Sequence, residues 1–344
     1  MPPDHLGRTW DEGSCHMGRQ PHETIWSLAT ATVASRTLHV VAELGVADHI
    51  DGAPVPTNEL AAGCGADQDA LDRALMLLAA HGVFARVGGA YAHTEASLLL
   101  RSDHPMSMRA FPRMMGMASF SASLDHLEHA VRTGEPAFRV VEPDGLFAHL
   151  QRHQDEARIF DASMSAKAAG DTAAVLAAYD FSRFATIADI GGGRGHLLRA
   201  VLEAAPDASG ILFDLPGVID AVGAPGERFS VHAGDFFVDA LPAADAYILM
   251  EVIHDWDDDQ AAAILSAVRR SAVPGATVLI IEAVADEETL DPVVRTLDMI
   301  MLAITGGRER TSTELEHLLS SAGFRANGTL PTPSPLRIVE AVDV

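Results

Sequence analysis

The stretch Ile187-Ala188-Asp189-Ile190-Gly191-Gly192-Gly193-Arg194-Gly195-His196 decides the fold, because a short apolar run that contains an acid leads directly into closely spaced glycines. Glycines at 191, 193 and 195 let the backbone turn tightly after a strand and bring a ligand close to the N–H groups of the following helix. A dinucleotide fingerprint G-x-G-x-x-G would need glycine where His196 stands, and no P-loop Lys-Ser or Lys-Thr pair follows. The stretch predicts a nucleotide-binding turn, although other strand-to-helix turns carry glycines too.

Two later apolar runs end in acids that suit the same ligand. Residues 211–214 end in Asp214, about 20 residues after the glycines, where a carboxylate can accept hydrogen bonds from both ribose hydroxyls. Asp235 stands next to Phe236, and an acid beside an aromatic ring suits the edge and the face of an adenine. Together these strand ends favour a turn that binds a nucleoside-containing cofactor over a strand-to-helix turn that binds no ligand.

Composition limits the partners and the compartment. The 344 residues predict two domains, and a hydrophobic fraction of 48% is ample for a core. The formal net charge of -24 argues against nucleic acid and an anionic membrane surface, because both attract clustered Lys and Arg. No apolar run reaches about 18 residues and no secretory leader is visible, so we expect a cytoplasmic protein. Cys15 and Cys64 are interpreted as free thiols.

Four segments are expected along the chain. Residues 1–20 lack periodicity and are interpreted as a disordered leader. Residues 21–103 predict helices followed by a Gly-Gly hairpin, the pattern of a winged helix. Residues 104–180 predict a helical linker with an acceptor-pocket segment. Residues 181–344 predict a parallel sheet with crossover helices, with strands at 187–190, 211–214, 229–232, 246–250 and 278–282 and a closing edge strand at 336–341.

A winged helix is often a DNA-binding module, and a regulator with a ligand-binding domain is therefore an alternative. The expected reading helix carries Asp67, Asp69 and Asp72 against a single Arg73. Acids at those positions would repel phosphate. We interpret residues 21–103 as a structural or dimerising domain.

His254 is the candidate for proton transfer. It follows the fourth expected strand and should lie beyond the carboxyl ends of the sheet, near the cofactor. The next strand ends in Glu282, and Glu309 stands in a later loop. An imidazole with a pKa of about 6.5 accepts a proton at neutral pH, whereas a phenol has a pKa of about 10 and is a poor nucleophile while neutral. The three residues therefore fit activation of a hydroxyl.

Each of these assignments has a plainer alternative. His254 could cap the next helix, and Glu309 could pair with a neighbouring arginine in its loop. The acids at 255 and 257–259 are better explained by the start of that helix than by a metal, and no metal is expected. The methionines and phenylalanines at 104–180 suit either a packed core or the wall of an adaptable apolar pocket.

At this point the sequence resembles the caffeate-type small-molecule O-methyltransferase family of plant phenylpropanoid and bacterial polyketide pathways. The resemblance runs from about Ile25 onward and rests on D-I-G-G-G-R-G (189–195), F-D-L-P (213–216), H-D-W-D-D (254–258), V-L-I-I-E (278–282) and G-G-R-E-R-T (306–311). It implies an α/β protein with a C-terminal Rossmann-like class I methyltransferase domain and a mainly helical, winged-helix-like N-terminal domain that forms a homodimer. It also implies S-adenosyl-L-methionine (SAM) as cofactor, S-adenosyl-L-homocysteine as product and no metal.

The resemblance implies methylation of a phenolic hydroxyl of an aromatic secondary metabolite, as in antibiotic biosynthesis. It makes His254 the general base, Glu309 the acid that orients it and Glu282 the carboxylate that flanks it. Cofactor contacts are expected at Asp189, Gly191, Gly193, Asp214, Leu215, Asp235, Phe236 and Met250. The acceptor pocket is expected to include Met115, Phe160, Met164, Asp255, Met299 and Leu302.

Two features bear on these expectations. Many family members carry Lys four residues before the base, where this chain has Met250, so one polar adenine contact is missing or replaced. The family also contains relatives that bind SAM but catalyse hydroxylation, decarboxylation or cyclisation of a polyketide, and those typically lack the histidine. With His254 present, we expect a working O-methyltransferase and keep such a relative as the alternative.

Overall fold

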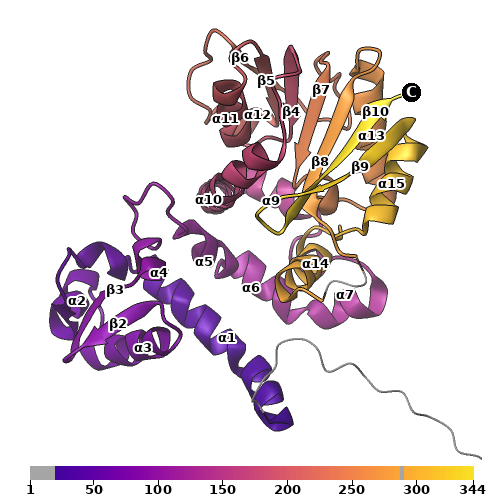
Figure 1. Ribbon diagram of the computed structural model, residues 1–344. Helices are drawn as coiled ribbons and strands as arrows, with labels where there is room; N and C mark the ends of the chain where they lie inside the picture. The colour runs from indigo at the N-terminus through magenta and orange to yellow at the C-terminus, as the bar shows by residue number, and fades with distance from the viewer. Residues whose placement is uncertain (1–19, 287–289) are drawn as a thin grey trace, which may run out of the picture.

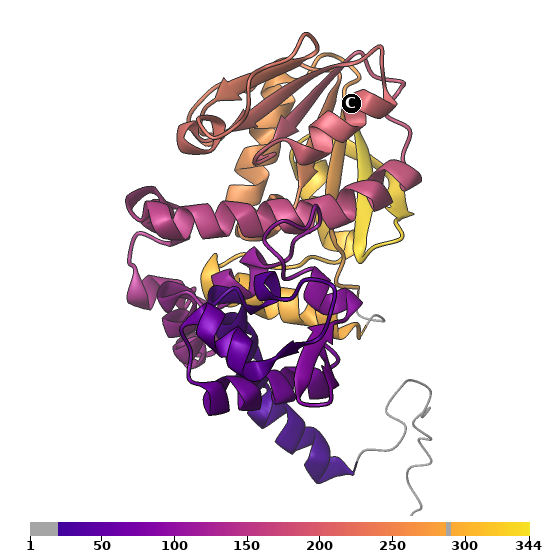
Figure 2. The same ribbon diagram turned by 90° about the vertical axis from the view of Figure 1, so that its left-hand side faces the viewer.

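The computed structural model describes residues 20–286 and 290–344, so Cys15 and the expected leader, apart from Gln20, lie outside the described residues. An N-terminal helical part and a C-terminal α/β part are separated by the long helix α10 (Gln154–Ala178), which runs beneath the sheet (Figures 1 and 2). Among the described residues, none of the helices combines the length and the apolar character that crossing a membrane requires.

The N-terminal part contains the expected winged-helix pattern. Its elements are α1 (Pro21–Glu43), η1 (Val46–His49), β1 (Val55–Pro56), α2 (Thr57–Cys64), α3 (Gln68–Ala80), β2 (Phe84–Val87), β3 (Ala90–His93) and α4 (Glu95–Leu98). Asp67 caps α3 by accepting the backbone N–H of Ala70 at 2.9 Å. Gly88 and Gly89 have φ angles of 56° and 87°, which close the turn between β2 and β3. The small sheet has the order β1-β3-β2.

A layer of short helices follows, and it recruits one helix from much later in the sequence. These helices are α5 (Ala110–Met115), α6 (Ala118–Asp125), α7 (Leu127–Thr133), α8 (Phe138–Val141) and α9 (Leu146–Arg152). Helix α14 (Pro292–Ile304) packs against α6, α7 and α8, and its Val294 also reaches an apolar cluster of the sheet (Figure 1). Phe120, Phe138 and Ile304 are buried in one apolar cluster there.

The C-terminal part is built on a seven-stranded sheet of order β6-β5-β4-β7-β8-β10-β9. Its strands are β4 (Thr186–Ile190), β5 (Ser209–Asp214), β6 (Phe229–Ala233), β7 (Ala246–Met250), β8 (Thr277–Ala283), β9 (Phe324–Pro331) and β10 (Leu336–Asp343). The first five pair in parallel, as the apolar runs predicted, whereas β10 is antiparallel to β8 and to β9. The expectation that 336–341 forms the edge is wrong, because β9 covers β10 and is itself the edge.

Alternate side chains of the buried strands serve the two faces of the sheet. Ile280 of β8 packs in a cluster with residues of α13 (Asp258–Ser271) and α15 (Ser312–Ser321). The next residue, Ile281, packs in a second cluster with α11 (His196–Ala204) and the end of α10. The short helix α12 (Pro216–Ile219) follows β5. Helices thus cover both faces, and the strand order reverses between β4 and β7, where a doubly wound sheet opens a crevice for ligands.

Candidate active site

The glycine turn after β4 adopts a backbone conformation that other residues rarely reach. Gly191, Gly193 and Gly195 have φ angles of 68°, 59° and 74°. A Cβ on Gly191 would stand 2.9 Å from a methyl group of Val252, and a Cβ on Gly192 would stand 2.4 Å from the carboxylate of Asp189. The turn therefore holds its backbone close to the sheet and leads into α11, so that its N–H groups are available to a ligand.

A buried aspartate, Asp189, and a partly buried one, Asp214, lie beneath and beside this turn. Asp189 is 1% exposed, and neither carboxylate oxygen has a hydrogen-bond partner among the described residues. Burial, reinforced by the charge of Asp214, raises the pKa of Asp189 to about 7. Asp214 accepts the N–H of Gly193 at 2.8 Å and the N–H of Leu215 at 2.7 Å, yet burial still raises its pKa to about 6. Such underused carboxylates fit a ligand that brings its own hydrogen-bond donors.

The ends of β6 and β7 supply an aromatic side to the same crevice. Asp235 accepts the N–H of Phe237 at 2.9 Å, and Phe236 packs edge-to-face on Trp256 at a centroid distance of 5.8 Å. Met250 ends β7 and is partly buried. An aromatic face and a carboxylate beside the glycine turn match the shape and polarity of a nucleoside.

His254 lies in the 3-10 turn η2 (Ile253–Asp255) after β7 and is held at three of its atoms. Its Nδ1 lies 2.9 Å from Oε1 of Glu309. Its backbone N–H donates to Oε1 of Glu282 at 3.0 Å, and its carbonyl accepts the N–H of Arg308 at 2.8 Å. The two acids therefore play different parts, because Glu309 contacts the imidazole whereas Glu282 contacts the main chain.

The imidazole sits in a strongly acidic setting. Burial alone lowers the pKa of His254, but the hydrogen bond that its imidazole donates to Glu309 and the negative charges of the surrounding acids outweigh burial and raise the pKa to about 9. Burial raises the pKa of Asp255 to about 6 and that of Glu282 to about 7. The ordinary histidine pKa expected from the sequence is therefore wrong for the cofactor-free protein.

The acids at 255–259 separate into different roles. Asp257 caps α13 by accepting the N–H of Gln260 at 2.8 Å, as expected for a helix start. Asp258 pairs with Arg310. Asp255, in contrast, is turned toward the base, with Oδ1 at 4.0 Å from Nε2 of His254. The interpretation of Asp255 as a helix-start acid is wrong, because α13 begins at Asp258.

Arg310 is a fully buried residue that the sequence did not single out for the site. Its guanidinium donates to the carbonyl of Ile253 at 2.9 Å and to that of Trp256 at 2.7 Å, and it pairs with Asp258 at 2.8 Å. These carbonyls lie just before and two residues after His254, so one side chain fixes both sides of the turn. The alternative that Glu309 pairs with a neighbouring arginine is wrong, because Arg308 pairs with Glu314 and Arg310 with Asp258.

Lys167 is a second residue that sequence reasoning missed. It lies on α10, forms an ion pair with Glu251, and is mostly buried. Burial lowers the pKa of its amine, against the opposing charges of nearby acids that include Asp255 and Glu309. Glu251 is the one described non-glycine residue with a positive φ, 54°. The available signal was that Lys167 is the only lysine in the 344-residue sequence.

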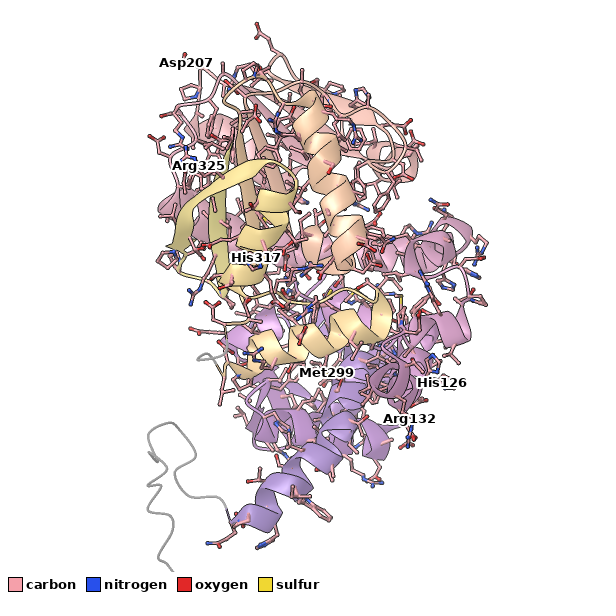
Figure 3. All side chains as sticks on the ribbon, turned by 90° about the vertical axis from the view of Figure 1, so that its right-hand side faces the viewer. His126, Arg132, Asp207, Met299, His317 and Arg325 are labelled. Atoms are coloured by element: carbon pink, nitrogen blue, oxygen red, sulfur yellow. The ribbon has the colours of Figure 1, made fainter. Side chains whose placement is uncertain are left out.

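The expected acceptor residues come together from two distant parts of the chain. Met115, Phe160, Met164 and Leu302 all pack, partly buried, against one apolar cluster formed by α5, α6, α8, α9 and α14. Met299, on the other hand, is 39% exposed on α14, so the structure does not bury it with the others (Figure 3). Asp161 forms an ion pair with Arg194 of the glycine turn at 3.5 Å, which links this wall to the cofactor side.

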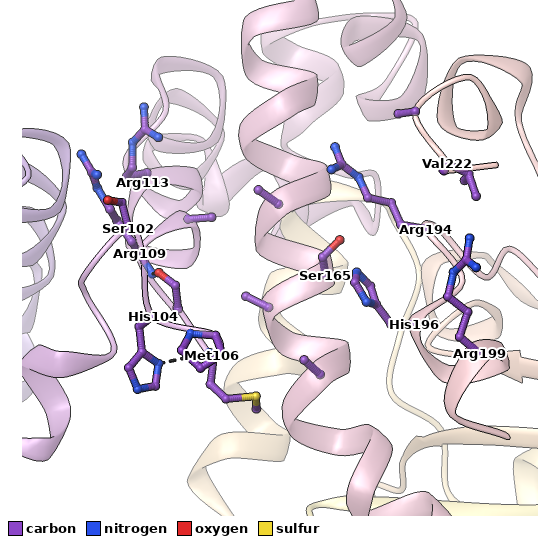
Figure 4. Close-up of a pocket in the computed structure, with 18 of the residues that line it drawn as sticks. Ser102, His104, Met106, Arg109, Arg113, Ser165, Arg194, His196, Arg199 and Val222 are labelled. Atoms are coloured by element: carbon purple, nitrogen blue, oxygen red, sulfur yellow. Dashed lines mark hydrogen bonds between the residues drawn. The ribbon is translucent and has the colours of Figure 1, made fainter. Parts of the chain in front are cut away.

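A separate, open cleft of about 820 Å³ lies between the N-terminal part, α10 and α11 (Figure 4). Arg109, Arg113, Arg194 and Arg199 line it. None of the expected site residues lines it. This cleft is thus not the place where His254 and the glycine turn meet.

The fold and the site together define a class I methyltransferase. Residues 124–325 match the O-methyltransferase domain, and residues 26–103 match the O-methyltransferase dimerisation domain. The second match argues against the DNA-binding interpretation of the winged helix.

Known proteins resemble the chain over nearly its whole length. A phenazine O-methyltransferase of Lysobacter antibioticus is 39% identical over 321 residues, which cover 91% of this chain and 94% of that protein. Human N-acetylserotonin methyltransferase, solved in complex with SAM, has a TM-score of 0.88 at 29% identity and covers 96% of this chain and 99% of its own. An O-methyltransferase from neocarzinostatin biosynthesis was solved with S-adenosyl-L-homocysteine and 1,4-dihydroxy-2-naphthoic acid. It has a TM-score of 0.75 at 34% identity, and the match covers 96% of this chain and 100% of that chain.

The chain therefore belongs to the O-methyltransferase family, and it is a SAM-dependent O-methyltransferase. The unpartnered carboxylate of Asp189 and the side-chain-free turn at Gly191 and Gly193 fit SAM as the cofactor. The comparisons lend no support to the alternative of hydroxylation, decarboxylation or cyclisation.

Proposed function

We propose that the protein methylates a phenolic hydroxyl of a fused-ring aromatic metabolite and that His254 is its general base. The observation that carries this proposal is the 2.9 Å contact between Nδ1 of His254 and Glu309. Because a carboxylate accepts a hydrogen bond from an N–H group, this contact keeps a proton on Nδ1, so that in the neutral imidazole the lone pair lies on Nε2. Nε2 has no hydrogen bond among the described residues and can accept the phenol proton.

The chain's residues orient the acceptor and receive its proton. Bound SAM supplies a methyl group on a positively charged sulfur. As the acceptor oxygen forms its bond to that methyl carbon and the carbon–sulfur bond breaks, the hydroxyl proton passes to Nε2 of His254, and Glu309 stabilises the imidazolium. Orientation is the larger contribution, because it can supply about 7–11 kcal/mol, whereas a general base contributes about 3–5 kcal/mol.

The apolar side chains of the expected acceptor pocket and the substrates named for the relatives both suggest the kind of aromatic molecule that is methylated. Methionine and phenylalanine side chains such as Met115, Phe160 and Met164 offer an apolar, adaptable surface for flat rings. The neocarzinostatin enzyme holds a dihydroxynaphthoic acid, and the Lysobacter enzyme is named for phenazines. We infer a bicyclic or tricyclic phenol for this chain as well.

We assign the cofactor contacts to the residues around the glycine turn. Asp214 would accept hydrogen bonds from the ribose hydroxyls of SAM, and Asp189 would accept them from the polar end of its amino-acid moiety. The ring of Phe236 would face the adenine. Gly191, Gly193, Leu215, Asp235 and Met250 complete the proposed cofactor set. Because Met250 has no charged group, Asp235 carries the polar contact to the adenine.

We also propose a homodimer that forms through residues 21–103. The match with the dimerisation domain supports it. So does α1, whose N-terminal half projects from the rest of the N-terminal part (Figure 1). The side chains of Ile25, Trp26 and Leu28 there are between 68% and 72% exposed. We further propose that residues 104–180 form the acceptor-binding segment and that residues 181–344 form the cofactor-binding domain. Helix α14 belongs to the second of these in sequence but contributes to the wall of the acceptor pocket. A Trp26→Asp variant should halve the molar mass measured by light scattering, and an unchanged mass would refute the interface.

A mass measurement tests the proposed reaction. The protein is incubated with SAM and a panel of naphthols, hydroxyphenazines and hydroxyquinones, with monocyclic phenols as controls. We expect a product heavier by one methyl group, formed from fused-ring phenols and lost when the hydroxyl is absent. Products that gain an oxygen or lose carbon dioxide would contradict methyl transfer.

The cytoplasmic location and the absence of nucleic acid and membrane partners stay predictions from the sequence.

A further inference from the structure

Three side chains with metal-ligating atoms meet at the junction of α8, α9 and α10. Glu142 follows α8, His149 lies within α9, and His153 stands between α9 and α10. One ligand atom from each lies within 4.8 Å of the other two. None of the three belongs to the residues proposed for SAM, the base or the acceptor.

The state of His149 is the decisive observation. Its side chain is 5% exposed, and its Nε2 lies 2.9 Å from Oε2 of Glu156. Glu156 also accepts the hydroxyl of Ser119 at 2.5 Å. Because a carboxylate only accepts, Nε2 carries the proton, and in a neutral ring Nδ1 is left with its lone pair. That Nδ1 is buried and makes no hydrogen bond to any described residue.

The unpartnered Nδ1 faces another electron-rich atom. It lies 3.2 Å from Oε1 of Glu142 without hydrogen-bond geometry. Two such atoms repel each other unless a cation lies between them. A tetrahedral Zn²⁺ with bonds of about 2.0–2.1 Å separates neighbouring ligand atoms by about 3.3 Å. The observed separation therefore matches one edge of a metal site.

A second proton on His149 is the competing explanation, because it would pair the ring with both Glu142 and Glu156. The ring of His153 stacks on that of His149 at a centroid distance of 4.1 Å, and a nitrogen of His153 lies within 4.8 Å of a carboxylate oxygen of Glu142. A second proton on His149 would not involve the side chain of His153. A metal ion would instead bind all three side chains. Glu156 would then be the carboxylate that accepts the other ring N–H of His149 and orients this ligand.

We propose that Glu142, His149 and His153 bind one divalent transition-metal ion of the Zn²⁺ type, with water completing the coordination. Two imidazoles and one carboxylate are a donor set that Zn²⁺, Co²⁺ and Ni²⁺ accept. His153 is exposed and can close onto the ion from solvent. The ion ties the turn after α8 to the start of α10, the helix that carries Phe160 and Met164. Its effect is therefore on stability rather than on the methyl-transfer step.

The test uses the full chain, freed of any histidine tag and stripped with EDTA. Zn²⁺ is titrated by calorimetry, Co²⁺ by visible absorption, and the melting temperature is measured with and without excess Zn²⁺. We expect one ion per chain, a tetrahedral Co²⁺ spectrum and a melting temperature that rises by several degrees. His153→Ala and Glu142→Gln should abolish all three effects. Glu156→Gln should weaken binding by about 10- to 100-fold.

His126→Ala is the matched control, because His126 is an exposed histidine of the same helical layer outside the cluster (Figure 3). It should bind as the unaltered protein does. Absence of Zn²⁺ binding, or equal binding by the His153→Ala and His126→Ala variants, would overturn the proposal. So would nitrogen NMR of the unaltered protein that shows both ring nitrogens of His149 protonated at neutral pH and unchanged by Zn²⁺.

Discussion

The cofactor side and the base side of the site hold their ionisable groups in opposite ways. On the cofactor side, within residues 20–286 and 290–344, the carboxylate of Asp189 has no hydrogen-bond partner and that of Asp214 accepts hydrogen bonds from two backbone N–H groups. On the base side His254 is fixed through its ring, its N–H and its carbonyl, and Arg310 braces the turn around it. The first region keeps hydrogen-bonding capacity for a ligand, whereas the second is preorganised before any ligand arrives. Changes on the base side should therefore lower kcat, and changes on the cofactor side should weaken binding.

Replacement of the base should have the largest effect on turnover. We expect His254→Gln to lower kcat by about 10²- to 10⁴-fold, the usual contribution of a positioned general base, while SAM binds at least as tightly, because a neutral side chain replaces an imidazole that is positively charged below its pKa of about 9. Steady-state kinetics and calorimetry measure the two quantities. His317→Gln, at an exposed histidine on α15, is the control and should leave both unchanged (Figure 3). If the His254 variant kept full activity at neutral pH, His254 would not be the base.

Replacement of the ribose-binding acid should produce the opposite pattern. Asp214→Ala removes a charged acceptor from two hydroxyls, so SAM binding should weaken by about 100-fold or more. Burial raises the folded-state pKa of Asp214 to about 6, so above the ordinary aspartate pKa the ionised side chain disfavours folding of the cofactor-free protein. The variant should therefore melt no lower than the unaltered protein at neutral pH. Asp207→Ala, at an exposed acid, is the control (Figure 3), and unchanged SAM affinity for the Asp214 variant would refute the ribose assignment.

Replacement of Arg310, which holds the turn around His254, should lower kcat less than replacement of His254 itself. Arg310→Lys keeps the charge but cannot reach Asp258 and both carbonyls at once. A displacement of His254 by about 1 Å should lower kcat by up to about 100-fold with unchanged SAM affinity. Arg325→Lys, at an exposed arginine of β9, should have no effect (Figure 3). Equal kcat for the two variants would show that the turn holds its shape without Arg310.

Removal of metal should have no effect on turnover. The acids after His254 are used by the helix cap, by Arg310 and by the imidazole, and the base is already supplied by the chain. Initial rates measured well below the melting temperature should be equal with and without EDTA. Rates that vanish with EDTA and return with Mg²⁺ would assign Asp255 and its neighbours to a catalytic metal instead.

The comparison of the two regions also explains what the sequence could and could not predict. The glycine turn and the parallel strands depend on local patterns, so residues 187–195 and the apolar runs were enough to predict them. Strand β9 was missed because it is half exposed and contains Gly328 and Pro331, without an apolar run. The recruitment of α14, the partners of Arg310 and the raised pKa of His254 all depend on residues that are far apart in the sequence, and local patterns do not encode them.

The pH dependence of the reaction tests the role of His254 most directly. In the unaltered enzyme kcat/KM should rise as His254 loses its proton, with an apparent pKa near 9 in the free enzyme. In kcat the same step should move to lower pH, because the positive charge of bound SAM disfavours the imidazolium. The His254→Gln rate should instead follow ionisation of the phenol itself, at a pKa of about 10 for an ordinary phenol. Two acceptors with different phenol pKa values should therefore shift the variant's profile but not the native one. Profiles that coincide for the native enzyme and the variant with both acceptors would contradict the account.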